Sequence, residues 1–178
     1  MTTKVKKWKV LSRKTVFQKY SREIEKVIFE LPDGTKSDFY IKKEGPAICV
    51  LALTKNKKVI LARQFRPGPD KIVLELPGGR AEKGETPKQA IERELLEETG
   101  YKGKARFVTE SLDCAYSTMR RFCFVATDCE KICEPKNTSS EICETVLLSL
   151  SDFRKLLRSG QMTDMEVGYL GLDFLGLL

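Results

Sequence analysis

The sequence has no histidine among its 178 residues. Hydrolases of the Ser-His-Asp and Cys-His types need an imidazole as general base, so both mechanisms are excluded. A metal site with histidine ligands is excluded as well. Hydrolytic or metal-dependent chemistry in this chain would therefore depend on other side chains, with carboxylates first among them.

The sequence also lacks any C-x-x-C pair, although it contains six cysteines. A zinc site built from four cysteines normally contains such pairs, so we do not expect one here. Most of the cysteines stand in apolar runs such as RFCFVA, which is typical of buried, reduced thiols. The cysteine pattern therefore indicates a reducing compartment.

Long apolar runs are missing too. The longest clean run covers residues 47–53 and is far too short to span a membrane. The N-terminal stretch MTTKVKKWKV has no apolar segment after its charges, unlike a secretory signal peptide. We therefore predict a cytoplasmic protein with no membrane partner.

The charge balance is basic, with 32 Lys and Arg against 25 Asp and Glu, for a net charge of +7. Such a surplus suits an anionic ligand such as a phosphate. Apart from a cluster at residues 4–9, the basic residues are spread along the chain, and no basic helix or aromatic-basic motif stands out. We expect a small anionic ligand and no nucleic acid.

Strand signals divide the chain into two unequal parts. In the first part, IEKVIFEL and SDFYIKK flank PDGTK, which is typical of two strands joined by a turn. The second part contains runs that predict further strands at 47–54, 58–65, 105–113, 120–127 and 143–150, and one in IVLELPGG (72–79) that stops at Pro77-Gly78-Gly79. We therefore predict a small N-terminal β subdomain over 1–44 and a larger domain over 45–178.

One helix is delimited by clear end signals. Thr86 is a good N-cap, Pro87 suits the first helical position, and Gln89 completes a capping box. Gly100 can end the helix in the left-handed conformation. Two further helices are predicted at 151–159, with Ser151 as a plausible cap, and at 163–175. These elements predict a mixed sheet with helices on its faces.

Three glutamates crowd one turn of this helix. Glu94, Glu97 and Glu98 have the spacing i, i+3, i+4, so they share one face. Like charges at this spacing destabilise a helix by roughly 0.2–0.5 kcal/mol per pair. A hard divalent cation such as Mg²⁺ or Mn²⁺ would offset that repulsion, because it prefers oxygen ligands. A solvated acidic face has the same spacing, so the spacing leaves both interpretations open.

The loop before the helix favours the metal interpretation. Gly78, Gly79 and Gly84 let the backbone approach a metal ion or a phosphate closely. Arg93 lies on the helix near enough to fold back onto Glu85 in the loop. Such a pair would hold the loop over the carboxylates.

This stretch resembles a complete Nudix box. It reads Gly79, five residues, Glu85, seven residues, Arg93-Glu94-Leu95, one residue, Glu97-Glu98, one residue, Gly100-Tyr101. The resemblance implies an α/β/α sandwich with the box as a loop-helix-loop, and hydrolysis of a nucleoside diphosphate linked to another moiety. It assigns the metal to a set of oxygen donors: Glu94, Glu97, Glu98 and the carbonyl of Gly78. It also implies that Arg93 holds Glu85 and that Glu85 is a support.

The likeness extends beyond the box. KVILARQFRPG, VLELPGG and the C-terminal helices resemble the ADP-ribose pyrophosphatase branch. The resemblance implies that ADP-ribose is cleaved to AMP and ribose 5-phosphate, and that the chain is a homodimer whose N-terminal parts are swapped. Arg66 would bind phosphate or ribose. Trp8 would stack on adenine, although a role as core anchor is equally open, with Phe39 or Tyr40 on the other face of the base.

Tyr116 departs from that branch, which usually carries a proline shortly after the box. A tyrosine in this neighbourhood resembles the dinucleoside polyphosphate hydrolases. Hydrolysis of a dinucleoside polyphosphate, or of another nucleotide pyrophosphate, is therefore the alternative activity. A non-catalytic Nudix module would lack a metal-binding glutamate, yet every one is present.

The resemblance to the ADP-ribose pyrophosphatase branch implies that the general base is a glutamate on the loop before the last core strand. The segment NTSSEICETVLL offers Glu141 and Glu144, and we favour Glu141 because it lies further into the loop. Glu97 or Glu98, acting through metal-bound water, stays open as an alternative. The expected reaction is attack of water on phosphorus while a glutamate takes the proton.

Overall fold

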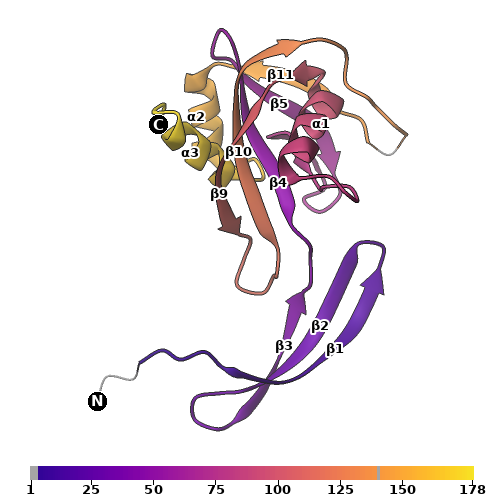
Figure 1. Cartoon of the computed structure of the whole chain (residues 1–178), viewed down its shortest axis with the longest axis vertical. Helices are drawn as coiled ribbons and strands as arrows, with labels where there is room; N and C mark the ends of the chain where they lie inside the picture. The colour runs from indigo at the N-terminus through magenta and orange to yellow at the C-terminus, as the bar shows by residue number, and fades with distance from the viewer. Residues whose placement is uncertain (1–3, 140) are drawn as a thin grey trace. The chain divides into compact units, whose positions relative to one another are not determined.

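The computed structural model describes residues 4–139 and 141–178. The chain forms two compact units (Figure 1). The first consists of Met1–Gly45 with Leu112–Arg120, and the second of Pro46–Ser111 with Arg121–Leu178. The sequence did not anticipate that Leu112–Arg120 joins the first unit. Two domains with the limits 1–44 and 45–178 remain a prediction.

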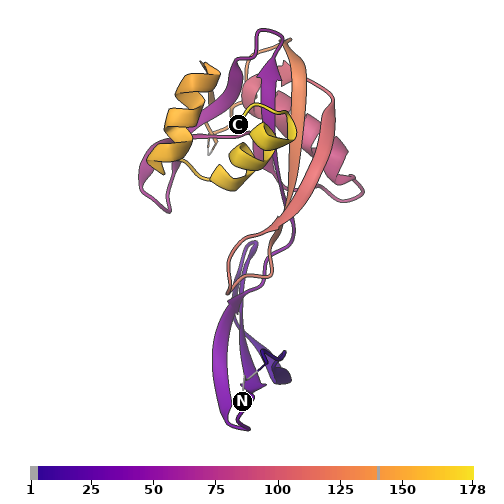
Figure 2. The same cartoon turned by 90° about the vertical axis from the view of Figure 1, so that its left-hand side faces the viewer.

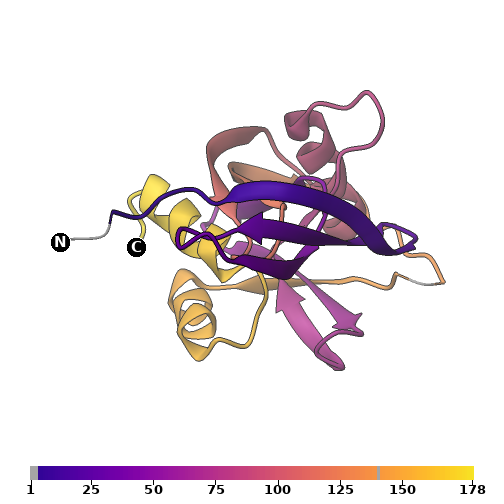
Figure 3. The same ribbon diagram turned by 90° about the horizontal axis from the view of Figure 1, so that it is seen from below.

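The first unit is a three-stranded antiparallel sheet. Its strands are β1 (Lys9–Lys19), β2 (Arg22–Glu30) and β3 (Lys36–Lys42), with β2 in the middle (Figure 3). The predicted turn between β2 and β3 forms, because Asp33 Oδ1 accepts hydrogen bonds from the Thr35 backbone N at 2.9 Å and from its hydroxyl at 2.7 Å. The N-terminal antiparallel sheet is thus confirmed.

The second unit contains a mixed sheet in the order β11-β5-β4-β10-β8, with β6 beside β5, β7 beside β4 and β9 beside β10. β10 runs parallel to β4, whereas β5 and β7 run antiparallel to it. The strands are β4 (Ala47–Thr54), β5 (Val59–Arg66), β6 (Lys71–Glu75), β7 (Gly78–Gly79), β8 (Tyr101–Lys102), β9 (Ala105–Leu112), β10 (Arg120–Lys131) and β11 (Glu144–Leu148). The strand predicted to stop at Pro77 does end before it, since Pro77 has no N–H to donate, whereas the short strand β7 beyond it was not predicted.

Helices cover both faces of this sheet (Figure 1). Ile48, Val50 and Ala52 of β4 pack in the apolar cluster that includes α1 (Pro87–Thr99). The alternate residues of β4 pack in the cluster of α2 (Leu150–Ser159) and α3 (Met165–Phe174). Figure 2 shows α2 and α3 beside each other, and a Cβ at Gly168 of α3 would lie 2.7 Å from Leu157 of α2. The predicted α/β/α sandwich is confirmed.

The predicted capping box of α1 is confirmed. The Gln89 N donates to Thr86 Oγ1 at 3.3 Å, and the Thr86 N donates to Gln89 Oε1 at 3.0 Å. Gly100 ends the helix with φ 72°, which an L side chain rarely adopts. Both ends of α1 are therefore set by local chemistry that the sequence displays.

The predicted start of α2 was wrong. Ser149, not Ser151, is the N-cap, because its hydroxyl accepts a hydrogen bond from the Asp152 N at 3.1 Å. The third helix begins at Met165 rather than at residue 163, because Asp164 is left-handed with φ 55° and precedes the first helical turn. The sequence does not show where α2 begins, since two serines stand near its start. It does not show where α3 begins either, since the conformation of Asp164 is not visible in the spacing.

The six cysteines are free, and four of them are buried. Cys114 and Cys133 are exposed, so the prediction of buried thiols holds for most but not all. Within the described residues, none of the helices has the length and apolar character needed to cross a membrane.

Candidate active site

Two of the predicted metal ligands lie together against β7. The Gly78 N donates a 2.9 Å hydrogen bond to Oε2 of Glu98, whose side chain is buried. Glu94, one turn earlier, covers Gly79 so closely that a Cβ there would lie 2.3 Å from Glu94 Oε1. A side chain at this position would therefore displace the Glu94 carboxylate.

The electrostatics of this pair suit a cation. Burial, reinforced by the charges of Glu94 and Glu141, raises the pKa of Glu98 to about 8. Burial also raises the pKa of Glu94. Two neighbouring carboxylates that are costly to ionise offer oxygen donors of the kind that Mg²⁺ prefers. Within the part of the chain that the structure describes, however, no group of three acidic or thiol side chains forms a ready-made ligand set.

Glu97 has different surroundings. Its carboxylate accepts hydrogen bonds from Lys136 Nζ at 3.1 Å and from Arg93 Nη1 at 3.0 Å. These contacts, with that to Lys136 the strongest, lower the pKa of Glu97. Its role as a third metal ligand stays a prediction. Sequence reasoning missed Lys136, which carries no motif and reaches the helix from a distant loop.

The structure forms the predicted pair between the helix and the loop. Arg93 binds Glu85 through two parallel hydrogen bonds, Nε to Oε1 at 2.9 Å and Nη2 to Oε2 at 3.0 Å. Arg93 Nη2 also donates to the Arg80 carbonyl at 3.1 Å. Bidentate geometry of this kind holds both partners in orientation. The segment between β7 and α1 is thereby tied to the helix that carries the carboxylates.

Arg66 and Glu141 line a common cavity of about 400 Å³. Burial would lower the pKa of Arg66, but Glu75, Glu98 and Glu141 raise it. Arg66 of β5 thus interacts electrostatically with Glu98 of α1 and with Glu141 of the loop before β11. Glu144 is engaged elsewhere, because Arg63 Nε donates to its Oε2 at 2.8 Å on the exposed surface of the sheet.

Sequence reasoning also missed Glu75. Its side chain is buried and accepts a 2.6 Å hydrogen bond from Arg66 Nε. The available signal was a single acidic residue inside the apolar strand IVLEL, where a charge is costly without a partner.

The predicted aromatic ligands gather within the first unit. The ring centroids of Trp8 and Phe39 are 5.3 Å apart, and Phe39 stacks on Tyr116 at 6.4 Å with an interplanar angle of 16°. Tyr40 does not join them, because consecutive residues of a strand point to opposite faces of the sheet. Its exposed ring instead has Lys26 Nζ 5.9 Å from its centroid. Trp8 itself is 40% exposed, less enclosed than a core anchor would be.

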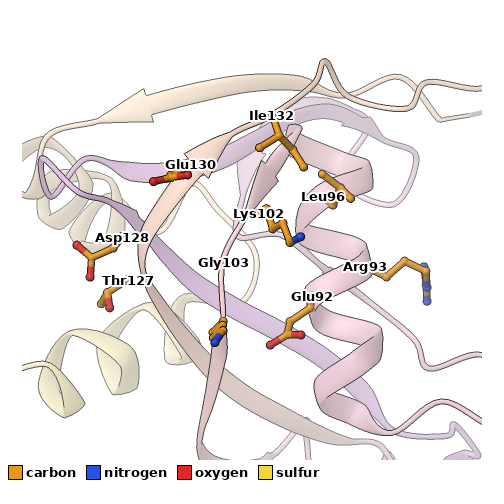
Figure 4. A pocket seen from close by; sticks show the side chains of 10 residues that line it. Glu92, Arg93, Leu96, Lys102, Gly103, Thr127, Asp128, Glu130 and Ile132 are labelled. Carbon is orange, nitrogen blue, oxygen red and sulfur yellow. The ribbon is translucent and has the colours of Figure 1, made fainter.

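Figure 4 shows a different cavity of about 700 Å³, lined by α1, β8 and β10. Glu92 and Leu96 line it from the helix, two residues out of phase with Glu94 and Glu98 and therefore on the other side of α1. Its charged lining residues are of both signs: Glu92, Arg93, Lys102, Lys104, Asp128 and Glu130. Arg93 links this cavity to the carboxylate side of the helix, because its Nη1 lies 3.1 Å from Glu94 Oε1.

The fold and the carboxylate-bearing helix define the class of the protein, and comparisons with known proteins agree. The NUDIX domain model matches residues 43–164. An ADP-ribose pyrophosphatase of Bacillus subtilis is 32% identical over 143 residues, covering 79% of this chain and 77% of that protein. The chain therefore belongs to the Nudix family, and it is a Nudix hydrolase.

Two further comparisons are narrower in what they show. An ADP-sugar pyrophosphatase of Mus musculus is 56% identical over 66 residues, 35% of this chain and 30% of that protein. A crystal structure of an ADP compounds hydrolase superposes with a TM-score of 0.81 at 20% identity, covering 99% of this chain and all of that one. At that identity the superposition supports the fold.

Proposed function

We propose that the chain hydrolyses the pyrophosphate bond of a nucleoside diphosphate sugar, and that ADP-ribose is the substrate, giving AMP and ribose 5-phosphate. The observation that carries this proposal is the convergence of Glu94, Glu98, Arg66 and Glu141, which combines acidic oxygen donors with a cation for phosphate. The names of the relatives from Bacillus subtilis and mouse support an ADP-linked sugar.

The cofactor in this proposal is Mg²⁺, with Mn²⁺ as a substitute. Glu94, Glu98 and the Gly78 carbonyl would hold it, and Glu97 would join them once released from Lys136. The raised pKa values of Glu94 and Glu98 support this assignment, because a bound cation would favour their ionised forms. A divalent ion held there would supply positive charge for the phosphate oxygens and would make a bound water more acidic.

The remaining roles belong to side chains around the cavity. Glu141 takes the proton of the attacking water, and its position beside Arg66 and its effect on Glu98 support this role. The Arg66 guanidinium binds phosphate oxygens, for which its planar fork is suited. Arg93 and Glu85 keep the loop in place. Glu144 is the weaker candidate for the base, because Arg63 holds it.

A dinucleoside polyphosphate is the alternative substrate, and Tyr116 is the residue that favours it. Tyr116 packs with Phe39 and Trp8 in a set of rings on which a nucleobase could stack. Stacking accepts any base and does not by itself select adenine. The role of Trp8 against adenine therefore stays part of the proposal.

We also propose a homodimer in the cytoplasm. Among the described residues of the first unit, Val27 is the one that is fully buried, and all eleven residues of β1 are exposed. Phe17 and Tyr20 are 50% and 90% exposed. A second copy covering this sheet would bury them. The free cysteines suit a reducing compartment such as the cytoplasm.

Sedimentation velocity should give a dimer, and Phe17→Asp should shift it to the monomer. A wild-type monomer at micromolar concentration would contradict this.

A substrate panel tests the activity. Cleavage of ADP-ribose, GDP-mannose, UDP-glucose, diadenosine polyphosphates and NADH is measured with Mg²⁺, with products resolved by chromatography. ADP-ribose should be cleaved fastest, and Glu98→Gln should lower kcat/KM at least about 100-fold, as expected for a group at the reacting atoms. Fastest cleavage of a dinucleoside polyphosphate would establish the alternative.

The same assay assigns the base through a matched pair of variants. Glu141→Gln should lower kcat by about 100-fold or more. Glu144→Gln removes an equal charge from the same segment and should leave kcat within about twofold, since rim ion pairs contribute little. Equal losses in both variants would remove Glu141 from its proposed role.

A further inference from the structure

Glu75 is a buried carboxylate directly beneath Arg66. It ends β6, is 3% exposed, and lies next to β5 in the sheet. A carboxylate in this position is costly unless all its lone pairs find donors. Its hydrogen-bond donors therefore indicate its role in the fold.

Three side chains from two elements satisfy this carboxylate. Oε2 accepts hydrogen bonds from Arg66 Nε at 2.6 Å and from Gln64 Nε2 at 3.0 Å. Oε1 accepts from the Thr163 hydroxyl at 2.6 Å, a shorter contact than the 3.1 Å from that hydroxyl to Asp164. Gln64 is in turn oriented by the Cys143 thiol, which lies 3.7 Å from its amide oxygen. The carboxylate is thus fixed before any ligand arrives.

The contact with Arg66 uses one particular nitrogen. Nε donates to Glu75, and the described residues show no hydrogen bond from Nη1 or Nη2, so these two atoms can bind a ligand. The Arg66 side chain is 40% exposed and lines the cavity that also contains Glu141. A guanidinium held at Nε presents its outer edge as a fork, the geometry that binds two phosphate oxygens at once.

We propose that Glu75 is a positioning residue that fixes the Arg66 guanidinium for phosphate binding, with Thr163 from the loop between α2 and α3 holding Glu75 in place. The proposal rests on the proposed function, because it takes a phosphate as the ligand of Arg66. Arginine has several rotatable bonds, and Glu75 removes that freedom before the substrate binds. The C-terminal helical segment thereby contributes to the site without touching the substrate.

Kinetics separate positioning from simple stabilisation. Glu75→Gln should raise KM for ADP-ribose roughly 10-fold with a smaller change in kcat, because supporting residues of a site typically contribute about 10–100-fold. Thr163→Val should raise KM less. Glu166→Gln is the matched control, since Glu166 pairs with Arg121 and has no contact with Glu75. It should leave KM unchanged even where it lowers the melting temperature.

A double-mutant cycle shows whether Glu75 acts through Arg66. In an Arg66→Lys background the Nε contact is gone, so Glu75→Gln should then raise KM by less than about twofold. An undiminished effect in that background, or an unchanged KM in Glu75→Gln itself, would overturn the proposal. If another compound of the panel is the preferred substrate, the cycle is run on that compound.

A measurement without substrate keeps the two proposals distinguishable. The ¹H–¹⁵Nε NMR signal of Arg66, assigned by its loss in Arg66→Lys, should be shifted and protected from exchange in the wild type and averaged with solvent in Glu75→Gln. Persistence of the protected signal in Glu75→Gln would refute the positioning role. Failure of the wild type to cleave any compound of the panel would refute the proposed function and leave this readout standing.

Discussion

The two units of the chain are built from the same kind of strand but are stabilised very differently. In the second unit, β4 has six consecutive buried residues and β5 begins with four. In the first unit, β1 is exposed along its whole length. Since burial of apolar area is the main favourable term in folding, backbone pairing in the first unit is not matched by a core.

Ion pairs do not make up that difference. The first sheet carries pairs such as Arg13–Glu25 at 3.0 Å and Lys26–Asp38 at 2.7 Å, between partly exposed side chains. Surface pairs of this kind typically contribute about 0–1 kcal/mol each. The second unit therefore has a large apolar core beneath its site, whereas the first unit has few buried side chains to stabilise its sheet.

The largest expected effect tests this contrast directly. Leu61→Ala removes a side chain that is 0% exposed and should lower the free energy of unfolding by about 2–5 kcal/mol. Leu11→Ala, in β1 at 37% exposure, should cost less than about 1 kcal/mol at low protein concentration. Urea denaturation measures both. Equal costs would mean that β1 is already covered under those conditions.

The second prediction concerns the buried charge of the second unit. The folded pKa of Glu98, about 8, lies above its ordinary value of 4.5, so its contribution to stability is present below pH 4.5 and is lost as pH rises through 8. In EDTA at pH 8, Glu98→Gln should therefore be more stable than wild type by roughly 2–4 kcal/mol, and the two should converge near pH 4.

Added Mg²⁺ sharpens this test. It should raise the melting temperature of the wild type at pH 8 more than that of Glu98→Gln, because a ligand that binds the folded state stabilises it. Equal shifts would show that the ion binds elsewhere.

A third, smaller effect compares one glycine from each unit. Gly79→Ala would place a Cβ 2.3 Å from Glu94 Oε1, so the carboxylate must move and kcat/KM should fall by about 10–100-fold. Gly45→Ala meets no atom within 4 Å and should leave kcat/KM unchanged. Steady-state kinetics on the preferred substrate measures both, and full activity in Gly79→Ala would remove Glu94 from the site.

The smallest predicted effect concerns the cap of α2. Ser149→Ala removes the acceptor for the Asp152 N and should cost about 1 kcal/mol of stability. Ser151→Ala removes the serine that the sequence favoured and should stay within about 0.5 kcal/mol. Thermal unfolding compares the two, and the reverse order would restore Ser151 as the cap.

The elements that the sequence predicted well are those set by neighbours along the chain. The limits of α1 follow from Thr86, Gln89 and Gly100, all within one turn of its ends. The ends of α2 and α3 were less predictable, because two serines compete for one cap and Asp164 adopts a left-handed conformation that spacing does not reveal. The end of β6 before Pro77 was predicted, whereas the two-residue strand β7 depends on its pairing with β4 and was not.

The candidate site divides in the same way. Glu94, Glu98, Arg93 and Glu85 lie close in sequence, so helix geometry and loop length were enough to bring them together. Glu75, Thr163 and Lys136 reach the site from other elements, and their side chains carry no motif. The pairing of Glu144 with Arg63 of β5 likewise joins segments far apart in the sequence and could not be predicted from spacing.

The sequence by itself determined the family, the acidic helix with its glycine loop, and the absence of histidine chemistry, because each depends on residue type and local spacing. Only the tertiary structure decided that Glu94 and Glu98 face β7 while Glu97 turns to Lys136. It alone placed a buried carboxylate behind Arg66. The physical reason is that burial and charge pairing depend on segments that meet only when the sheet and its helices have packed.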